Sequence, residues 1–360
     1  MRAAVLTEFG KAFEFWDLDQ RGPMKGEVRV KIMACAICHS DIHFVDGELG
    51  GECPMVLGHE ASGEIVEIGE GVEDLAVGDR VAVTLVRHCG DCPCCQKGYP
   101  ATCETHLRDA YTPLSHQGEA VEHGIKTAAF AEETVVHASQ VVKVGDKIPW
   151  DAAALLACGV ITGYGAATHT AQIEEGATVA VVGCGGVGLN AIQGAKYCKA
   201  GQIIAVDMAE DRLAAAITFG ATDRVNASQS DAIKGVKSAT GRRGADYVLV
   251  TVGSEAAINQ SFRMAAPGGV IVLVGMPSLE AVTTFSPVIF SSLSHRVLGS
   301  LMGHMKIKEE IPKLVERYET GELKLDQLVT GHYAFDELNE AMDTTRRGEG
   351  LRNVVLIGAA

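Results

Sequence analysis

Short apolar runs rich in β-branched residues, separated by glycines, fill about the first 150 residues of the chain. The clearest of them stand at residues 27–33, 63–68, 80–83 and 134–137. Runs of this length between turn residues are typical of β-strands. The pattern therefore predicts a β-rich barrel or sandwich for this half of the protein.

From Thr178 the pattern changes to apolar strands that alternate with alanine-rich helical segments. A strand at 178–182 leads into a glycine-rich loop and a helix that continues through Tyr197. Further apolar strands follow at residues 203–207, 248–253 and 270–275. Because strands that alternate with helices build βαβ units, we predict a parallel, doubly wound sheet of the α/β class.

The last segment returns to helical spacing. Residues 307–319 and 335–346 both repeat apolar positions at intervals of three and four, and a terminal strand follows at 353–357. A stretch of about 60 residues is short for a third domain. We expect it to pack on the first, β-rich domain.

Composition and charge narrow the classes of function. The chain has 360 residues, of which 47% are apolar and 21% charged, with 10 prolines against 41 glycines, as expected of a folded protein of about two domains. Its net charge of −15 would repel nucleic-acid phosphates and anionic lipids. The start MRAAVLTEFG does not resemble a secretory signal, and we find no run of about 18 apolar residues. We expect a cytoplasmic protein without a nucleic-acid or membrane partner.

Four of the eleven cysteines have the spacing C-x2-C-x2-C-x7-C, and they are Cys89, Cys92, Cys95 and Cys103. Such short loops let four thiolates converge on a tetrahedral zinc ion. The alternative is a redox dithiol, although the usual strand-to-helix context of such a motif is missing from the pattern. Cys94 could replace Cys95, but the even spacing favours Cys95. A zinc ion with four protein ligands has a structural role, so the chemistry must lie elsewhere.

Three further candidates for metal ligands are scattered along the chain: Cys38, His59 and Cys158. Taken singly, a buried cysteine is usually a small hydrophobic residue and a buried histidine a hydrogen-bonded core residue. Two thiolates and one imidazole would nevertheless leave zinc a fourth position for water or substrate. Spacing alone does not join these three residues.

A glycine motif follows the strand at 178–182. Gly183, Gly185 and Gly188 form G-x-G-x-x-G at the start of a helix, where backbone N–H groups favour a pyrophosphate; the alternative is an ordinary tight turn. Asp207 ends the next strand, 19 residues after Gly188. Its carboxylate can accept the hydroxyls of an adenosine ribose and would repel a 2′-phosphate, which favours NAD over NADP.

Several motifs together resemble the zinc-containing medium-chain alcohol dehydrogenases. They are Gly58-His59-Glu60 with Gly63, Cys38-His39-Ser40-Asp41-x-His43, the four-cysteine segment, CGVITGYGAA from Cys158, the glycine loop and the closing GEGLRNVVLI. They occur in the family's order over essentially the whole chain. The resemblance implies a GroES-like catalytic domain at 1–159 and 301–360, with the zinc lobe at about 86–104, and a Rossmann NAD-binding domain at 160–300.

The resemblance also implies roles for individual residues. Cys38, His59 and Cys158 would bind a catalytic zinc, with Glu60 behind the metal and Asp41 orienting the His59 imidazole. A proton would pass from Ser40 through the cofactor ribose to His43 and solvent. The residues that face the cofactor would be His39, Thr162, Gly183, Gly185, Gly186, Val187, Gly188, Asp207, Arg212, Val252, Val274 and Arg352.

The implied activity is reversible hydride transfer between an alcohol, held as a zinc-bound alkoxide, and NAD, with two zinc ions per chain. Alternatives in the same family are a thiol-adduct formaldehyde dehydrogenase and an enzyme that keeps NAD tightly bound. An inactive structural or regulatory relative and a zinc-free quinone reductase stay as further alternatives. Leu85 stands where many relatives carry an aromatic ring, so the alcohol is left open. The strand at 296–300 resembles an edge that pairs across a homodimer, and a homotetramer is also open.

Overall fold

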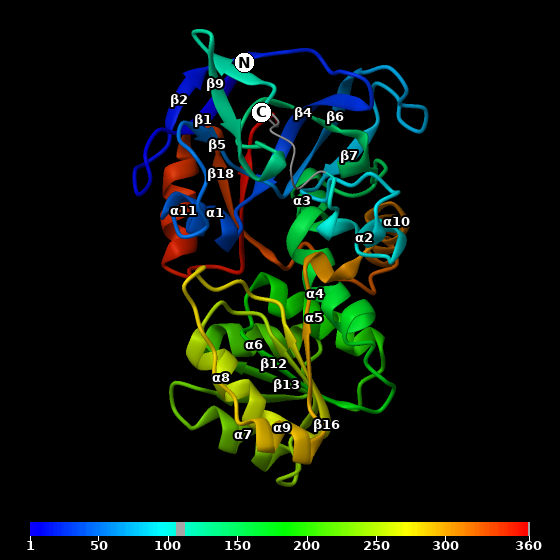
Figure 1. Ribbon diagram of the computed structural model, residues 1–360, viewed down its shortest axis with the longest axis vertical. Coiled ribbons are helices and arrows are strands. Elements are labelled where there is room, and N and C mark those ends of the chain that lie inside the picture. The colour runs from blue at the N-terminus through cyan, green and yellow to red at the C-terminus, as the bar shows by residue number, and fades with distance from the viewer. Residues whose placement is uncertain (106–111, 359–360) are drawn as a thin grey trace. The chain divides into compact units, whose positions relative to one another are not determined.

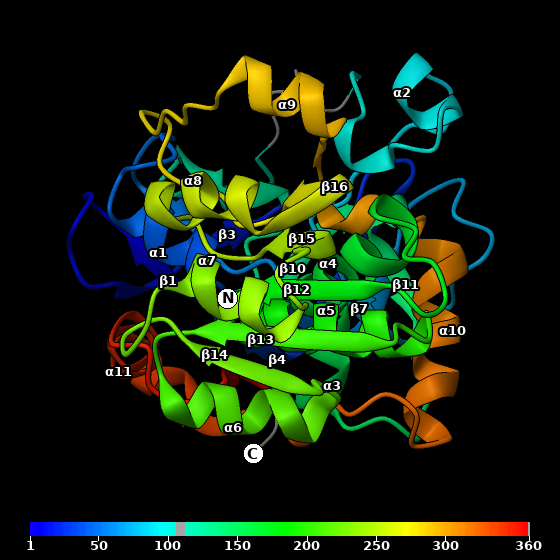
Figure 2. The same cartoon turned by 90° about the horizontal axis from the view of Figure 1, so that it is seen from below.

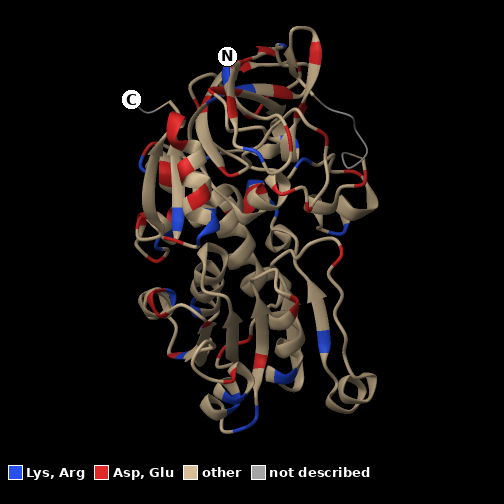
Figure 3. Ribbon diagram, turned by 90° about the vertical axis from the view of Figure 1, so that its left-hand side faces the viewer, with Lys and Arg blue, Asp and Glu red and all other residues tan. Residues whose placement is uncertain are grey.

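The computed structural model describes residues 1–105 and 112–358. The chain divides into two units, Met1–Cys158 with Lys306–Ala360, and Gly159–Met305, which are described separately below (Figure 1). The domain boundaries predicted from the sequence, after residues 159 and 300, are one residue and five residues away from these divisions. Acidic residues occur along the chain of both units (Figure 3).

Two sheets form the frame of the first unit. The strands of one sheet are β1 (Arg2–Leu6), β2 (Glu14–Asp17), β3 (Asp19–Gln20), β5 (Met55–Val56), β8 (Leu114–His116) and β9 (Glu119–His123). Those of the other are β4 (Glu27–Ala36), β6 (Ala61–Ile68), β7 (Arg80–Val83), β10 (Glu133–His137), β11 (Val141–Lys143), β18 (Val329–Ala334) and β19 (Arg352–Leu356). Their orders in the described chain are β2-β1-β5-β9-β8-β3 and β11-β7-β6-β4-β19-β18, with β10 also on β4.

Strand β4 is central to the second sheet because it pairs antiparallel with β6, β10 and β19. Val28, Val30 and Ile32 are fully buried whereas Lys31 is exposed, which is the alternation of a strand with one face on the core. The pairing with β19 attaches the C-terminal segment to this unit. The helices of the unit are α1 (His39–Val45), α2 (Pro93–Gln96), α3 (Trp150–Leu155), α10 (Ile307–Glu319) and α11 (Leu338–Arg346).

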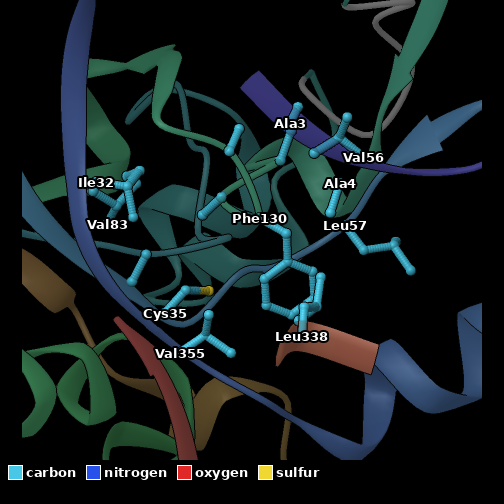
Figure 4. Close-up of a cluster of buried hydrophobic side chains, with 14 of the residues drawn as sticks. Ala3, Ala4, Ile32, Cys35, Val56, Leu57, Val83, Phe130, Leu338 and Val355 are labelled. Atoms are coloured by element: carbon cyan, nitrogen blue, oxygen red, sulfur yellow. The ribbon is translucent and has the colours of Figure 1, made fainter. Parts of the chain in front are cut away.

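Phe130 lies in the apolar core of the first unit, close to Leu57, Leu338 and Val355 (Figure 4). It is fully buried, and its backbone N–H donates to the Leu57 carbonyl at 2.9 Å. A Cβ atom on Gly58, whose φ is +89°, would come within 2.7 Å of the Phe130 nitrogen. Only glycine fits there, and the chain leaves this close approach directly into His59.

The second unit contains one parallel sheet in the order β14-β13-β12-β15-β16-β17. These strands are β12 (Thr178–Val182), β13 (Gln202–Asp207), β14 (Asp223–Asn226), β15 (Ala245–Val250), β16 (Ala265–Leu273) and β17 (Arg296–Gly299). The helices are α4 (Ile161–Gly165), α5 (Gly186–Tyr197), α6 (Glu210–Phe219), α7 (Ala232–Ala239), α8 (Glu255–Met264) and α9 (Pro287–Leu293) (Figure 2). The order reverses between β12 and β15, where doubly wound sheets bind their ligands.

A helical stretch from Trp150 to Thr170 contains two π-helical turns, Leu156–Val160 and Ala166–Thr170. It is long and apolar enough to cross a membrane by length and composition, but 83% of its apolar window is buried inside the protein. Such burial is what a core helix shows. The first π-helical turn carries Cys158.

The structure confirms the β-rich first half and the doubly wound parallel sheet, with shifts at some element ends. The strand expected at 248–253 ends at Val250, and the strand expected at 270–275 begins earlier, at Ala265. Residues 335–337 form a 3-10 turn before helix α11. Strands β1, β2 and β5 were not among the runs predicted from the sequence.

The burial of Phe130 predicts the effect of its removal. Phe130→Ala should lower the free energy of unfolding by about 3–5 kcal/mol, because it leaves a cavity in a core that includes the Gly58 approach. Urea denaturation followed by circular dichroism measures this. The exposed Met24→Ala is the control, with a change within about 0.5 kcal/mol. Equal effects of the two substitutions would contradict the assignment of Phe130 to the core.

Candidate active site

Asp41 organises the first part of the site from the start of helix α1. It is fully buried and is the third residue of the helix. Its Oδ2 accepts the backbone N–H of Cys38 at 3.0 Å, which satisfies a donor that the helix itself leaves without a partner. This bond fixes the backbone that carries the Cys38 thiol.

The other oxygen of Asp41 reaches the segment that follows Gly58. Oδ1 accepts the backbone N–H of Gly58 at 3.1 Å and lies 3.1 Å from Nδ1 of His59. A carboxylate only accepts hydrogen bonds, so Nδ1 of His59 carries a hydrogen, and in the neutral ring Nε2 carries the lone pair. His59 Nε2 is buried and has no hydrogen-bond partner in residues 1–105 and 112–358.

Cys158 completes the group from the π-helical turn. One ligand atom each from Cys38, His59 and Cys158 lies within 4.8 Å of the others, and all three residues are buried. A hydrogen bond from Cys158 and the neighbouring His59 hold the pKa of the Cys38 thiol well below its usual value. The same bond to Cys38 raises the pKa of Cys158. Burial lowers the pKa of His59, but the Asp41 carboxylate raises it overall.

These donors fit a zinc ion. Thiolates and imidazole are the ligands that zinc prefers, and an inward-facing imidazole nitrogen without a protein partner is what a metal ligand requires. A set of two sulfurs and one nitrogen leaves a fourth tetrahedral position free. Such a position can take water or a substrate oxygen.

Glu60 and Arg352 form a buried ion pair beside this group. Glu60 is fully buried, Arg352 is 7% exposed, and the Arg352 Nη2 donates to Glu60 Oε2. Arg352 is therefore not a solvated surface charge. The pairing balances a carboxylate that would otherwise be costly to bury next to two thiols.

Ser40, His43 and His39 all lie on helix α1. The Cys38 thiol donates to the Ser40 hydroxyl oxygen at 3.7 Å, so Ser40 faces this predicted metal ligand. His43 is three residues further along and thus on the same face of the helix as Ser40. His39 is exposed at the first helical position.

The cysteine lobe brings its four predicted ligands together. The sulfurs of Cys89, Cys92, Cys95 and Cys103 lie within 4.8 Å of one another. Backbone N–H groups of Cys89 and Cys92 donate to two of these sulfurs at 3.3 Å. Several hydrogen bonds lower the pKa of Cys89 to about 6, and the bond from the Thr105 hydroxyl has the largest effect. The Cys94 sulfur instead contacts Glu104 at 3.2 Å.

The glycine loop of the second unit joins β12 to helix α5. Gly183 has φ +92°, and a Cβ on Gly188 would lie 1.8 Å from the Gly183 carbonyl. Nothing lies within 4 Å of a Cβ built on Gly185, which begins the helix as its N-cap. The loop therefore packs tightly on one side and presents open backbone on the other, as pyrophosphate binding requires.

Asp207 at the end of β13 holds this loop. Its Oδ2 accepts the N–H of Cys184 at 2.7 Å, and its Oδ1 accepts the N–H groups of Met208 and Ala209 at 2.7 and 3.0 Å. The carboxylate is half-buried. It keeps lone pairs for further donors, such as sugar hydroxyls.

The other predicted cofactor residues of the second unit are dispersed around the sheet. Gly186 and Val187 open helix α5, and Val252 lies against Gly183. Thr162 and Val274 are buried, with the Thr162 hydroxyl 3.6 Å from the Met302 sulfur. Arg212 is half-buried on α6.

Comparison with known proteins places the chain in a family. A family model described as zinc-binding dehydrogenase matches residues 186–320, and one described as alcohol dehydrogenase GroES-like domain matches residues 24–146. An alcohol dehydrogenase from Malus domestica is 36% identical over 369 residues, which cover 98% of this chain and 96% of the relative. The chain belongs to the zinc-containing medium-chain alcohol dehydrogenases. This confirms the resemblance and the predicted fold class of a GroES-like domain and a Rossmann domain.

Two further proteins match this alcohol dehydrogenase family member over almost its whole length. An NDMA-dependent alcohol dehydrogenase from Amycolatopsis methanolica is 34% identical over 369 residues, 99% of each protein. The crystal structure of benzyl alcohol dehydrogenase from Acinetobacter calcoaceticus has a TM-score of 0.93 and 33% identity, and the match covers 99% of both chains.

Two features of this alcohol dehydrogenase family member were not predicted from its sequence. Thr251 donates its hydroxyl to the Gly183 carbonyl at 2.7 Å and supports the glycine loop. Thr251 directly follows β15, which pairs with β12, and this position could have indicated its contact with the loop. The pairing of Glu60 with Arg352, 292 positions apart, has no local signal.

The hydrogen bond from His59 to Asp41 predicts an effect on metal binding. Asp41→Asn should weaken zinc binding by Cys38, His59 and Cys158 by about 10–100-fold, because an amide N–H₂ would face one of the N–H donors that the carboxylate now accepts. Competition with a chromophoric chelator measures the affinity. The cysteine lobe is the internal control and should keep its zinc. Unchanged affinity in the variant would show that Asp41 does not orient His59.

Proposed function

We propose that this protein is an NAD-dependent zinc alcohol dehydrogenase that interconverts an alcohol with the corresponding aldehyde or ketone. The observation that carries the proposal is the buried Nε2 of His59, which has no hydrogen-bond partner among the described residues and lies within 4.8 Å of two cysteine sulfurs. Zinc would act there as a Lewis acid that makes a bound alcohol more acidic.

The residues of the first unit would prepare the alcohol for hydride loss. Cys38, His59 and Cys158 would leave one position open for the substrate oxygen, and Asp41 would keep the imidazole in the tautomer that binds a metal. Ser40 would accept the proton of the alcohol, and His43 would pass it on toward solvent. Burial of the three ligands excludes water from all but the open position.

The glycine loop supports the choice of a dinucleotide as hydride acceptor. The open backbone at Gly185 and the start of helix α5 suit a pyrophosphate. The Asp207 carboxylate suits ribose hydroxyls and disfavours a 2′-phosphate, so NAD is the proposed cofactor. His39 and Arg212 are further proposed phosphate or ribose contacts.

A second candidate is an alcohol oxidoreductase that keeps its NAD bound and recycles it with an external acceptor. The 34% identity to an NDMA-dependent alcohol dehydrogenase over 99% of both proteins favours keeping this candidate. It uses the same donors and the same glycine loop. The two differ in whether the dinucleotide leaves after each turnover.

The proposal also covers a second zinc ion, the oligomeric state and the cellular location of the protein. Cys89, Cys92, Cys95 and Cys103 would hold a structural zinc ion, giving two zinc ions per chain. The edge strand β17 carries the half-exposed Val297 and would pair with a second copy in a homodimer or homotetramer. All eleven cysteines are free thiols, which supports a cytoplasmic location.

Zinc content and NADH formation test the proposed activity. Dialysed protein should hold about two zinc ions per chain, and absorbance at 340 nm should rise when NAD and primary or secondary alcohols are added. Removal of zinc with a chelator should abolish turnover, and added zinc should restore it. Zinc without NADH release, but with aldehyde formed in the presence of NDMA, would favour the second candidate. Protein that binds no zinc would overturn both.

Asp207 gives a test of the cofactor. Asp207→Ser should raise kcat/KM for NADP by about tenfold and lower that for NAD, because it removes a charge that would repel a 2′-phosphate. Steady-state kinetics with both dinucleotides measures the ratio. Asp211→Ser, an exposed carboxylate on α6, is the matched control and should leave the ratio unchanged. An unchanged ratio in the Asp207 variant would remove the argument for NAD.

A further inference from the structure

The chain that leaves helix α1 turns back toward His43. The helix ends at Val45, and Gly47 follows with φ +76°. In this turn the Gly47 N–H donates to the Phe44 carbonyl at 3.0 Å and the Glu48 N–H donates to the His43 carbonyl at 2.9 Å. The left-handed backbone that glycine permits thus brings the Glu48 side chain back over the last turn of the helix.

The Glu48 side chain meets the imidazole of His43. Its Oε2 lies 2.5 Å from Nδ1 of His43. Since a carboxylate only accepts, the contact requires the hydrogen on Nδ1, so the neutral ring carries its lone pair on Nε2. The state of the ring is therefore set by Glu48 and not by His43 alone.

Stability offers little reason for this contact. The His43 side chain is 26% exposed and that of Glu48 42% exposed, and pairs with such access to water contribute little to folding. Asp46, two residues earlier, makes a comparable pair with Arg346 at 2.6 Å, which already ties the turn to helix α11. The orientation of His43 is what Glu48 adds.

We propose that Glu48 is a positioning residue for proton transfer: it holds His43 with Nε2 ready to accept a proton, and its negative charge balances the imidazolium that results. The proposal rests on the proposed function, in which His43 takes the alcohol proton. One proton enters at Nε2 and then leaves from Nε2 to water, while Nδ1 keeps its hydrogen, so the ring returns to its starting tautomer. The Oε1 and Oε2 atoms of Glu48 gain no proton in the cycle.

A double-mutant cycle tests the role in turnover. Glu48→Ala should lower kcat by about tenfold with little change in KM, as part of the roughly 10²–10⁴-fold that acid–base catalysis contributes. In a His43→Ala background the same change should alter kcat by less than about twofold. Asp46→Ala, from the same turn, is the matched control and should stay within about twofold of the wild type. Equal losses in both backgrounds, or no loss in the wild type, would overturn the proposal.

A spectroscopic measurement decides the tautomer without any activity. In protein with ¹⁵N-labelled histidine, the His43 resonances, identified by their loss in His43→Gln, should show hydrogen on Nδ1. Glu48→Ala should lose this preference while the melting temperature stays within about 3 °C. Hydrogen on Nε2 in the wild type would overturn the proposal. If the protein forms no NADH although His43 shows the Nδ1–H tautomer, this result would instead contradict the proposed function.

Discussion

The buried carboxylate of Asp41 is the interaction on which the first unit's chemistry depends. It accepts hydrogen bonds from the Cys38 N–H, the Gly58 N–H and the His59 ring, and thereby joins the start of helix α1 to a segment 17 positions later. A buried charge is tolerated only when its lone pairs are used. The same three bonds that make Asp41 acceptable in the core also aim two predicted metal ligands, Cys38 and His59, at one point.

The two ends of helix α1 divide the proposed proton path between them. At its start lie Ser40 and the predicted metal ligand Cys38, whose side chains contact each other. At its end the turn at Gly47 brings Glu48 back to His43. A single short helix therefore sets the distance between the site where a proton is lost and the side chain that takes it to solvent. Asp41 fixes the first turn of this helix through its hydrogen bond from the Cys38 N–H.

Local patterns in the sequence predicted the parts of this protein that local forces determine. The cysteine lobe and the glycine loop each lie within one short segment, so their spacing carried the geometry. Cys38, His59 and Cys158 are joined only by tertiary structure, and the family resemblance was needed to group them. The pairs Glu60–Arg352 and Thr251–Gly183 join segments that are distant in the sequence, so the periodicity of hydrophobic residues does not predict them. The Glu48 contact is local, but it depends on a left-handed turn whose effect on a side chain cannot be obtained from hydrophobic spacing.

The distribution of the two metal sites along the chain has a consequence for the order of assembly. The lobe closes between Cys89 and Cys103, 14 positions apart, whereas Cys38 and Cys158 are 120 positions apart. Closing the longer loop costs about 2 kcal/mol more chain entropy by length alone, and it also requires the core around Phe130 to be in place. If both proposed sites hold zinc, the lobe would bind its ion already in a nascent or unfolded chain, while the second set would become a ligand cluster only in the folded unit. Metal content counted site by site would thus report how far folding has advanced.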